Sequence, residues 1–387
     1  MSDPILLVSE LFPPAVGGSA VLFWNVYGRL KNVPVTVLAS TVTAGSSEHQ
    51  DGPFRIVPAQ LNGTHRGIRP AAALRQHVRI ASAIRNRTHH QSAWVHCARP
   101  LPEGAAALLA GIGPGRKRRY VSWVHGEDLS AALTSREHGW LARRVCLNAA
   151  AIIANSRFTA QLVESLGVPS GRIRVIYPGV DPARFTPDVQ PHAGATLTPG
   201  AGPVLLSVGR LQRRKGHDTA IEATAELRHE LPGLRYLIAG DGQERARLEA
   251  LAAARGVTDR VVFLGEVADA ELPGLFSACD IFVMPNRADA HVVEGFGIVF
   301  LEAAATARPT IGGRSGGVPE AIADGQTGLL VTGTDALELA NAIRTLATSP
   351  DLRATMGSAG RKRVLDAFTW ERAAAEMQRL HAELSAG

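Results

Sequence analysis

The chain has 387 residues and a formal net charge of +6 at pH 7, and 45% of its residues are hydrophobic while 20% are charged. This length exceeds what one hydrophobic core usually supports, so two domains of about 180 residues are expected. No apolar run reaches the roughly 18 residues of a membrane-spanning helix, and the three cysteines are too scattered for a disulfide framework or a zinc site.

Apolar, β-branched runs alternate with helical stretches along the whole chain. In the first half they cover residues 5–9, 33–39, 94–97, 120–124 and 151–155. In the second half they cover residues 204–209, 234–240, 261–265, 281–285 and 309–313. This alternation indicates parallel sheets that are covered by helices on both faces. The sequence therefore predicts an α/β protein with two doubly wound domains, whose ligands would bind beyond the carboxyl ends of the strands.

The boundaries of these domains follow from composition. Residues 186–203, TPDVQPHAGATLTPGAGP, lack periodicity and are rich in Pro, Gly and Ala, which indicates a linker. We therefore expect a first domain over residues 1–185 and a second over residues 204–368. The amphipathic stretch TWERAAAEMQRLHAEL begins at residue 369 and predicts a helix in the C-terminal segment 369–387.

Positive charge is concentrated in the first half. Residues 1–185 contain 21 Lys and Arg against 10 Asp and Glu, whereas residues 186–387 contain 20 against 25. Within residues 70–87, Leu74, Val78, Ala81 and Ile84 are expected on one helical face beside arginines, a pattern typical of helices at anionic surfaces. An ordinary solvated face has the same pattern. A nucleic-acid partner is not expected, because no recognition motif or interleaved aromatic residues are present.

The N-terminus lacks the basic segment and the cleavage site of a signal peptide. A cytoplasmic protein is therefore expected. If the basic helix contacts lipid, the protein would be peripheral at the inner face of the cell membrane.

Two cations follow the first strand of the second domain. In SVGRLQRRKGHD, the strand ends at Gly209 and is followed by Arg210 and Lys215. A guanidinium and an ammonium held together at a strand end suit a diphosphate, although a solvated loop would look similar. The next strand end has Gly240 beside Asp241, which leaves room for a ligand near the backbone. No GxGxxG motif follows any strand, which argues against a nicotinamide dehydrogenase.

The segment EGFGIVFLEA places two carboxylates, Glu294 and Glu302, around an apolar helix start. Gly295 and Gly297 allow a tight entry into this helix, whose first N–H groups attract anions. An unpaired carboxylate in an apolar segment is costly. We therefore expect both glutamates to accept hydrogen bonds from the hydroxyl groups of a sugar ligand, or else to lie at the solvent edge of the helix.

In the first half, two predicted strands are also followed by residues that could contact a ligand. Gly17 and Gly18 in LFPPAVGGSA can bring backbone N–H groups close to an anion. His125 in YVSWVHGEDL ends a strand beside a glycine and two carboxylates, and Asp128 could orient an acceptor. A tight turn and a loop histidine are the alternatives.

Taken in order, these segments resemble glycosyltransferase family 4, the retaining nucleotide-sugar enzymes of the GT-B fold. The resemblance covers nearly the whole chain and depends on the order of its motifs. They are FPPAVGG, HGED, NSRFTAQL, VIYPGVDPARF, SVGRLQRRKG, IAGDG, FLGEV, EGFGIVFLE and PTIGGRSGGVPEAIADGQTGLLV.

The resemblance implies a fold and roles for individual residues. It implies two facing Rossmann-like domains with a cleft between them, and a C-terminal helix that crosses back to the first domain. Arg210 and Lys215 would bind the donor diphosphate, Glu294 the donor sugar, Glu302 the ribose, and His125 would lie near the transferred sugar. The donor-binding set would comprise Gly17, Gly18, Gly209, Gly240, Asp241, Val267, Gly295, Phe296, Gly297, Ile298, Val299 and Glu302, with the backbone around Val267 contacting the base.

The expected reaction is transfer of a hexose from a nucleotide diphosphate sugar to a hydroxyl group with retention of configuration. No Asp-x-Asp motif is present, so neither a metal nor another cofactor is expected, and side-chain cations would stabilise the leaving group. The acceptor would be a glycolipid, a glycan or a small metabolite, the first two in glycolipid or exopolysaccharide biosynthesis. The alternative is a sugar-nucleotide epimerase or binding protein that performs no transfer.

Overall fold

The structure is a computed structural model, and the chain forms two compact units. It describes residues 3–14, 17–40, 48–61, 67, 69, 71–88, 93–111, 119–190, 202–290 and 292–386. Residues 15–16 of the FPPAVGG motif and residues 191–201 of the expected linker lie outside this set. The first unit comprises residues 1–178 and 370–387, and the second comprises residues 179–369.

The first unit is built on a sheet in the strand order β3-β4-β2-β1-β5-β6-β7-β8. Its strands are β1 (Ile5–Ser9), β2 (Val35–Ser40), β3 (His49–Asp51), β4 (Phe54–Ala59), β5 (Trp94–Cys97), β6 (Tyr120–Val124), β7 (Ala151–Ala154) and β8 (Ile173–Val175). All neighbours pair in parallel except β3 and β4. The expected parallel sheet is confirmed, with an antiparallel hairpin added at one edge.

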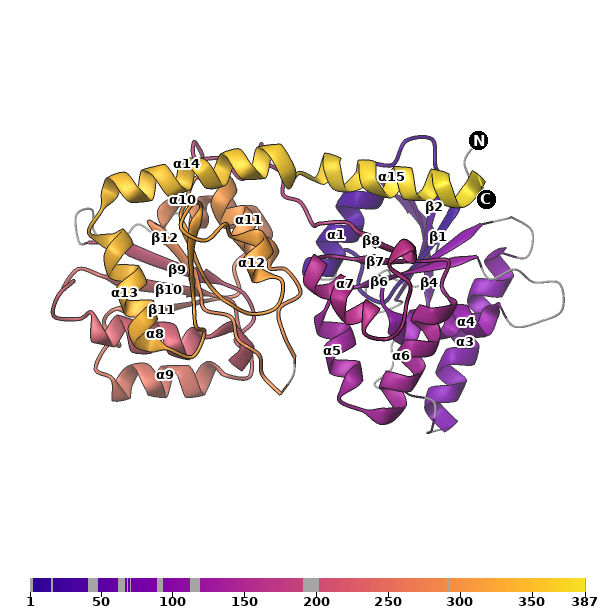
Figure 1. The fold of residues 1–387 in the computed structure, drawn as a ribbon, viewed down its shortest axis with the longest axis horizontal. Helices are drawn as coiled ribbons and strands as arrows, with labels where there is room; N and C mark the ends of the chain where they lie inside the picture. Colours follow the sequence, from indigo (N-terminus) through magenta and orange to yellow (C-terminus); the bar gives the residue numbers. More distant parts are fainter. Residues whose placement is uncertain are drawn as a thin grey trace. The chain divides into compact units, whose positions relative to one another are not determined.

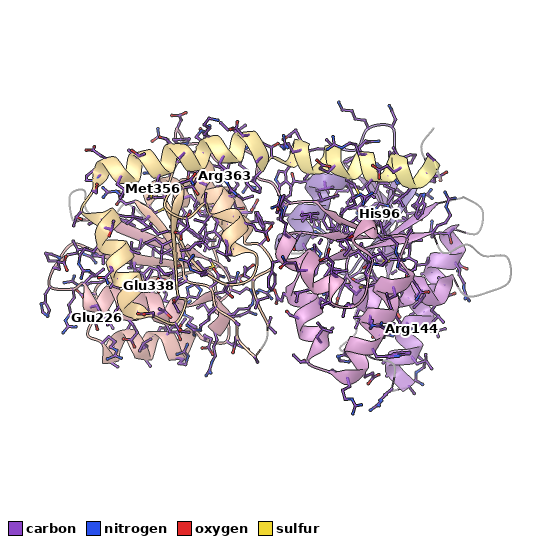
Figure 2. All side chains as sticks on the ribbon, viewed as in Figure 1. His96, Arg144, Glu226, Glu338, Met356 and Arg363 are labelled. Atoms are coloured by element: carbon purple, nitrogen blue, oxygen red, sulfur yellow. The ribbon has the colours of Figure 1, made fainter. Side chains whose placement is uncertain are left out.

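Helices cover both faces of this sheet, as Figure 1 shows, with α15 on one face and α3, α4 and α6 on the other. The helices are α1 (Gly18–Tyr27), α3 (Ala71–Thr88), α4 (Ala105–Ala110), α5 (Glu127–Leu133), α6 (Arg136–Asn148), α7 (Arg157–Glu164) and α15 (Trp370–Ala386), with short turns η1 (Pro100–Gly104) and η2 (Ser170–Arg172). The C-terminal helix α15 packs on α1. It also contacts His96, which lies inside this unit in Figure 2, because the ring centroids of His96 and His381 are 5.8 Å apart.

The second unit has a parallel sheet in the strand order β11-β10-β9-β12-β13-β14. Its strands are β9 (Val204–Val208), β10 (Arg235–Ala239), β11 (Val261–Gly265), β12 (Ile281–Met284), β13 (Thr310–Gly313) and β14 (Gly328–Val331). Its helices are α8 (His217–Glu226), α9 (Arg245–Ala254), α10 (Leu272–Ala278), α11 (Ile298–Ala305), α12 (Val318–Ala321), α13 (Ala336–Ala347) and α14 (Pro350–Ala367), with turns η4 (Arg213–Lys215) and η5 (Asp269–Glu271).

Successive side chains of β12 point to opposite faces of the second sheet, and helices cover both faces. Ile281 and Val283 pack into the cluster that includes residues of α8 and α13. Phe282 points to the opposite face, where its ring lies 5.5 Å from that of Phe276 on α10 and 5.5 Å from that of Phe300 on α11. Helix α14, which carries Met356 and Arg363 in Figure 2, packs on α11. Both faces of β12 are therefore buried, as in a doubly wound sheet.

The change from the first to the second unit lies at residues 178 and 179, so residue 185, the expected end of the first domain, belongs to the second unit. Backbone contacts explain this position. Val180 pairs with Thr369 and donates its N–H to the carbonyl oxygen of Phe368. Arg361 donates to the carbonyl oxygen of Phe185.

Helix α3 differs from the expected orientation. Ala81 and Ile84 are buried as expected, but Leu74 and Val78 are 49% and 51% exposed. The buried face is centred on Ala73, His77, Ile80 and Ile84. At about 100° per residue, Leu74 and Val78 lie about 100° or more around the helix from this centre. The prediction of one common apolar face was therefore wrong.

Within the described residues, no helix is both long enough and apolar enough to cross a bilayer.

Candidate functional site

The turn after β9 brings two cations onto one carboxylate in the second unit. Lys215 donates from Nζ to Oε2 of Glu294 at 2.7 Å, and Arg214 donates from Nη1 to the same oxygen at 2.7 Å. Asn286 adds a hydrogen bond from Nδ2 at 3.3 Å. The side chains of Arg214, Lys215 and Glu294 are 6%, 12% and 15% exposed. The cluster is therefore largely shielded from water, and it has one more positive than negative charge.

The ionisation of Glu294 is set by this cluster. Burial alone favours the protonated carboxyl group, but the charges of Lys215 and Arg214 and their hydrogen bonds outweigh it and lower the pKa of Glu294 to about 2. Glu294 is therefore a carboxylate at any physiological pH. Its Oε2 is occupied by the two cations, so a sugar hydroxyl group would have to bind to its Oε1.

Close backbone packing holds the turn that carries Lys215. Gly216 has a φ of +76°, and a Cβ at this position would overlap the carbonyl oxygen of Pro285. A Cβ at Gly240, whose φ is +134°, would overlap the carbonyl oxygen of Gly209. The segments after β9, β10 and β12 therefore approach one another more closely than residues with side chains would allow.

The other predicted residues of this sheet edge are more open. The side chain of Arg210 is exposed, and no ion pair fixes it to any residue that the structure describes. Asp241 is exposed and accepts the N–H of Gly242 at 2.6 Å. Val267, which follows β11, is half-buried. Arg210, Asp241 and Val267 thus follow three neighbouring strands, with the first two available to a ligand.

The predicted tight entry into α11 is present. Gly297 precedes the helix with a φ of +91°, and Glu302 lies within it. Gly295, Phe296 and Gly297 are buried, and Ile298 and Val299 are half-buried. The N-cap residue Gly297 makes no side-chain hydrogen bond to the N–H groups of this first turn.

Glu302 titrates near neutrality. Burial raises its pKa to about 7, with Arg184 opposing the shift and Asp269 adding to it. Arg184 is itself paired with Asp269 at 2.7 Å. Both protonation states of the predicted ribose acceptor are therefore accessible near neutral pH, and a ligand that donates hydrogen bonds to it would favour the carboxylate.

This shift predicts a pH dependence of stability. A carboxyl group whose pKa is higher in the folded chain than the ordinary 4.5 contributes stability that is fully present below pH 4.5 and is lost as the pH rises through about 7. Relative to the wild type, Glu302→Gln should therefore gain stability on going from pH 4.5 to pH 8, by up to about 3 kcal/mol. Urea unfolding of both proteins at these pH values measures the difference, and a pH-independent difference would contradict the prediction.

His125 follows β6 in the first unit and is held between aromatic rings. Its ring stacks on Trp123 at a centroid distance of 6.0 Å and meets Phe23 edge-on at 5.7 Å. Nε2 lies 3.0 Å from the carbonyl oxygen of Ala98. Since a carbonyl only accepts, Nε2 carries the proton and Nδ1 is the free acceptor. Burial lowers the pKa of His125, so the imidazole is neutral at pH 7.

Asp128 and the two glycines Gly17 and Gly18 belong to the local structure around two helix starts in the first unit. Oδ1 of Asp128 accepts the N–H groups of His125 at 2.9 Å and Leu129 at 2.8 Å. Its Oδ2 is buried without a partner among the described residues. Gly17 and Gly18 lie at the start of α1, and no described residue other than the chain neighbours of Gly17 is within 4 Å of a Cβ built there. Asp128 therefore accepts hydrogen bonds from the backbone of its own loop.

Sequence reasoning missed two groups of residues. Arg214 and Asn286 belong to the Glu294 cluster, and the only signal was the run of three basic residues at 213–215. In the first unit, Arg99 donates to Glu10 at 2.6 Å and to the buried Glu103 at 3.2 Å, after β1 and β5. No motif singled out these three residues, because Glu10 is far in sequence from Arg99 and Glu103.

Two family models match the chain. A model described as Glycosyltransferase Family 4 matches residues 16–184, and one described as Glycosyl transferases group 1 matches residues 190–363. The GDP-mannose-dependent alpha-(1-6)-phosphatidylinositol monomannoside mannosyltransferase of Mycolicibacterium smegmatis is 32% identical over 385 residues, which is 97% of each chain. The D-inositol 3-phosphate glycosyltransferase of Corynebacterium jeikeium is 35% identical over 68% of this chain and 67% of its own.

Solved structures share the fold over nearly the whole chain. Sucrose-phosphate synthase from Thermosynechococcus elongatus matches with a TM-score of 0.81 and 25% sequence identity. The match covers 99% of each chain. The Anabaena protein HepE, solved in complex with UDP and glucose, has a TM-score of 0.78 and 21% identity and covers 98% of this chain and 99% of its own.

Proposed function

This chain belongs to glycosyltransferase family 4 and has the GT-B fold, and we propose that it transfers a mannosyl residue from GDP-mannose to a hydroxyl group of a phosphatidylinositol mannoside. Its glycosyltransferase activity and use of a nucleotide sugar follow from the family. The donor and acceptor are proposed from the M. smegmatis relative. The structural observation that carries the proposal is the shielded cluster of Lys215, Arg214 and Glu294 beside the exposed Arg210.

The chemistry follows from the charges of this sheet edge. Breaking the bond between the anomeric carbon and the diphosphate places negative charge on the leaving oxygen. Lys215 would stabilise that charge with little reorganisation, because Glu294 already fixes its ammonium group, and Arg210 would add a second positive charge. We propose that the acceptor oxygen attacks from the same face and gives its proton to the departing phosphate oxygen. The configuration would thus be retained with no protein nucleophile.

His125 would assist without a charge of its own. A neutral imidazole that donates from Nε2 to Ala98 presents Nδ1 as an acceptor. It can therefore accept a hydrogen bond from a sugar hydroxyl group and favour positive charge at the anomeric carbon. His125 does not need to act as a general base.

A transfer assay tests the proposed function. The purified chain is incubated with GDP-mannose, UDP-glucose or UDP-N-acetylglucosamine and with phosphatidylinositol monomannoside or D-inositol 3-phosphate. The proposal predicts release of GDP and a mannosylated lipid from the first donor and the first acceptor. A product with D-inositol 3-phosphate alone would reassign the acceptor. A changed sugar on an intact nucleotide would indicate an epimerase and overturn the proposal.

We also propose that transfer needs no divalent metal, because the side-chain cations Lys215 and Arg210 would stabilise the charge that develops on the leaving group. Turnover in EDTA should stay within about twofold of turnover in Mg²⁺, since no metal would carry the Lewis-acid role. The same assay measures this. Loss of turnover in EDTA that Mg²⁺ or Mn²⁺ restores would contradict metal independence.

Helix α3 presents a surface that would suit the membrane in which the proposed lipid acceptor lies. Leu74 and Val78 are about half exposed, and Arg75 and Arg79 beside them are exposed as well. Figure 1 places α3 on the sheet face opposite α15. Exposed apolar side chains flanked by arginines suit a membrane surface with anionic lipids. We propose that α3 contacts such a surface.

Vesicle flotation tests this contact. The wild type should float with vesicles that contain phosphatidylinositol and remain behind with neutral vesicles. The double variant Leu74→Ser, Val78→Ser should bind vesicles about tenfold more weakly, because it loses the apolar area that the membrane would bury. Leu337→Ser is the matched control, since Leu337 is 63% exposed on α13 of the second unit. Equal recovery with neutral and anionic vesicles would contradict the proposal.

A further inference from the structure

An ion pair with two parallel hydrogen bonds lies beside the Glu294 cluster. Arg287, in the segment after β12, donates from Nη1 to Oδ1 of Asp218 at 2.8 Å and from Nη2 to Oδ2 at 2.8 Å. Nη1 also lies 2.9 Å from the hydroxyl oxygen of Thr219, which in turn donates to the carbonyl oxygen of Gly333. The pairing geometry is the strongest that an arginine and a carboxylate form.

Apart from Arg214 and Glu294, this pair is the most shielded arginine ion pair among the described residues of the second unit. The side chains of Arg287 and Asp218 are 17% and 19% exposed. Arg344 and Glu230, which also form a close pair in this unit, are 38% and 45% exposed. Shielding from water strengthens a well-aligned ion pair and makes its disruption costly. Arg287 and Asp218 should therefore hold the two segments that carry them firmly together.

The connection joins the two segments that carry the charged cluster. Asp218 lies in the first turn of α8, directly after the turn with Arg214 and Lys215. Arg287 lies in the segment that runs from β12 to Glu294. Its own N–H donates to the carbonyl oxygen of Arg214 at 2.9 Å. Arg287 thus ties the cation turn to the carboxylate segment through both its backbone and its side chain.

We propose that Arg287, through Asp218, is a positioning residue that sets the distance between Lys215 and Glu294 and so aims the ammonium group of Lys215 at the donor diphosphate. This inference rests on the proposed function. Neither Arg287 nor Asp218 needs to touch the substrate. A misplacement of about 1 Å at a charged group can lower a rate about 100-fold.

A series of variants separates positioning from folding. Arg287→Met removes the ion pair, Arg287→Lys keeps the charge without the two parallel hydrogen bonds, and Arg344→Met is the control that breaks an exposed pair in the same unit. Transfer from GDP-mannose to phosphatidylinositol monomannoside is measured, and each kcat is divided by the number of GDP-binding sites from calorimetry. This division removes any effect of an unfolded fraction.

Positioning predicts a drop in kcat of about 10- to 100-fold for Arg287→Met, a smaller drop for Arg287→Lys and none for Arg344→Met. The KM for GDP-mannose should change by less than about threefold, because every cation of the cluster remains. Unchanged kcat in Arg287→Met, or an equal loss in Arg344→Met, would overturn the inference. Absence of transfer by the wild type would instead refute the proposed function.

The pH profile provides a readout that a purely structural role would not move. Among the described residues, the charged groups that face Glu294 are Arg214 and Lys215, with Asn286 as its neutral neighbour. Larger distances from these cations would raise the pKa of Glu294. The acidic limb of the kcat profile should therefore shift to higher pH in Arg287→Met. It should stay in place in Arg344→Met. Identical acidic limbs in these two variants would contradict positioning.

Discussion

Replacing Lys215 by alanine should lower the turnover of GDP-mannose by about 100- to 1000-fold, the usual cost of removing one group that stabilises charge in a transition state. The ammonium group of Lys215 is held 2.7 Å from Glu294 and is 12% exposed, so it acts where water screens little. Arg214 remains paired with Glu294 in this variant. The fold should therefore persist, with an unfolding midpoint close to that of the wild type.

Arg213→Ala is the matched control for this prediction. Arg213 lies in the same turn, but its side chain is 60% exposed and its partner, Glu244, is 3.5 Å away. Its loss should change turnover by less than about threefold, as expected for an exposed ion pair. Steady-state rates and circular dichroism of the three proteins give the comparison. Lys215→Ala with a wild-type rate would remove Lys215 from the reaction.

Glu294→Gln should destabilise the second unit by about 3–5 kcal/mol, because it leaves Arg214 and Lys215 without their shared counter-charge in a shielded site. The effect should depend on pH. The pKa of Glu294 is about 2 in the folded chain and 4.5 ordinarily, so its contribution is fully present above pH 4.5 and is lost as the pH falls towards 2.

Urea unfolding at pH 7 and at pH 3 measures both parts of this prediction. Glu249→Gln is the control, since Glu249 is 48% exposed and pairs with Arg245 on the surface of α9. The difference between Glu294→Gln and the wild type should shrink at pH 3, whereas Glu249→Gln should stay within about 1 kcal/mol of the wild type at pH 7. A loss below 1 kcal/mol for Glu294→Gln at pH 7 would show that the pair contributes no net stability.

The ten apolar runs predicted as strands are confirmed, because a strand buried on both faces needs an unbroken apolar sequence, such as residues 281–285. The hairpin of β3 and β4 was missed. It lies at a sheet edge, and β4 contains both Arg55 and Pro58, which obscure the pattern. Periodicity also failed to orient α3, because several residues on different sides of that helix are apolar.

The candidate site was predictable only in part. Lys215 and Glu294 follow strands of one parallel sheet, so the topology alone brings them to the same edge. Their direct contact could not be predicted, because it joins residues far apart in sequence. The same holds for Arg287 and Asp218. Within the run at 213–215, the sequence gives no reason for Arg214 to be buried and Arg213 exposed.

The proposed function requires a diphosphate bound at the carboxyl edge of the second unit's sheet, and a crystal structure with GDP tests this directly. It predicts β-phosphate oxygens within about 3 Å of Nζ of Lys215 and of the guanidinium group of Arg210, the distance of a charge-assisted hydrogen bond. GDP whose phosphates lie beyond the reach of both side chains would contradict it.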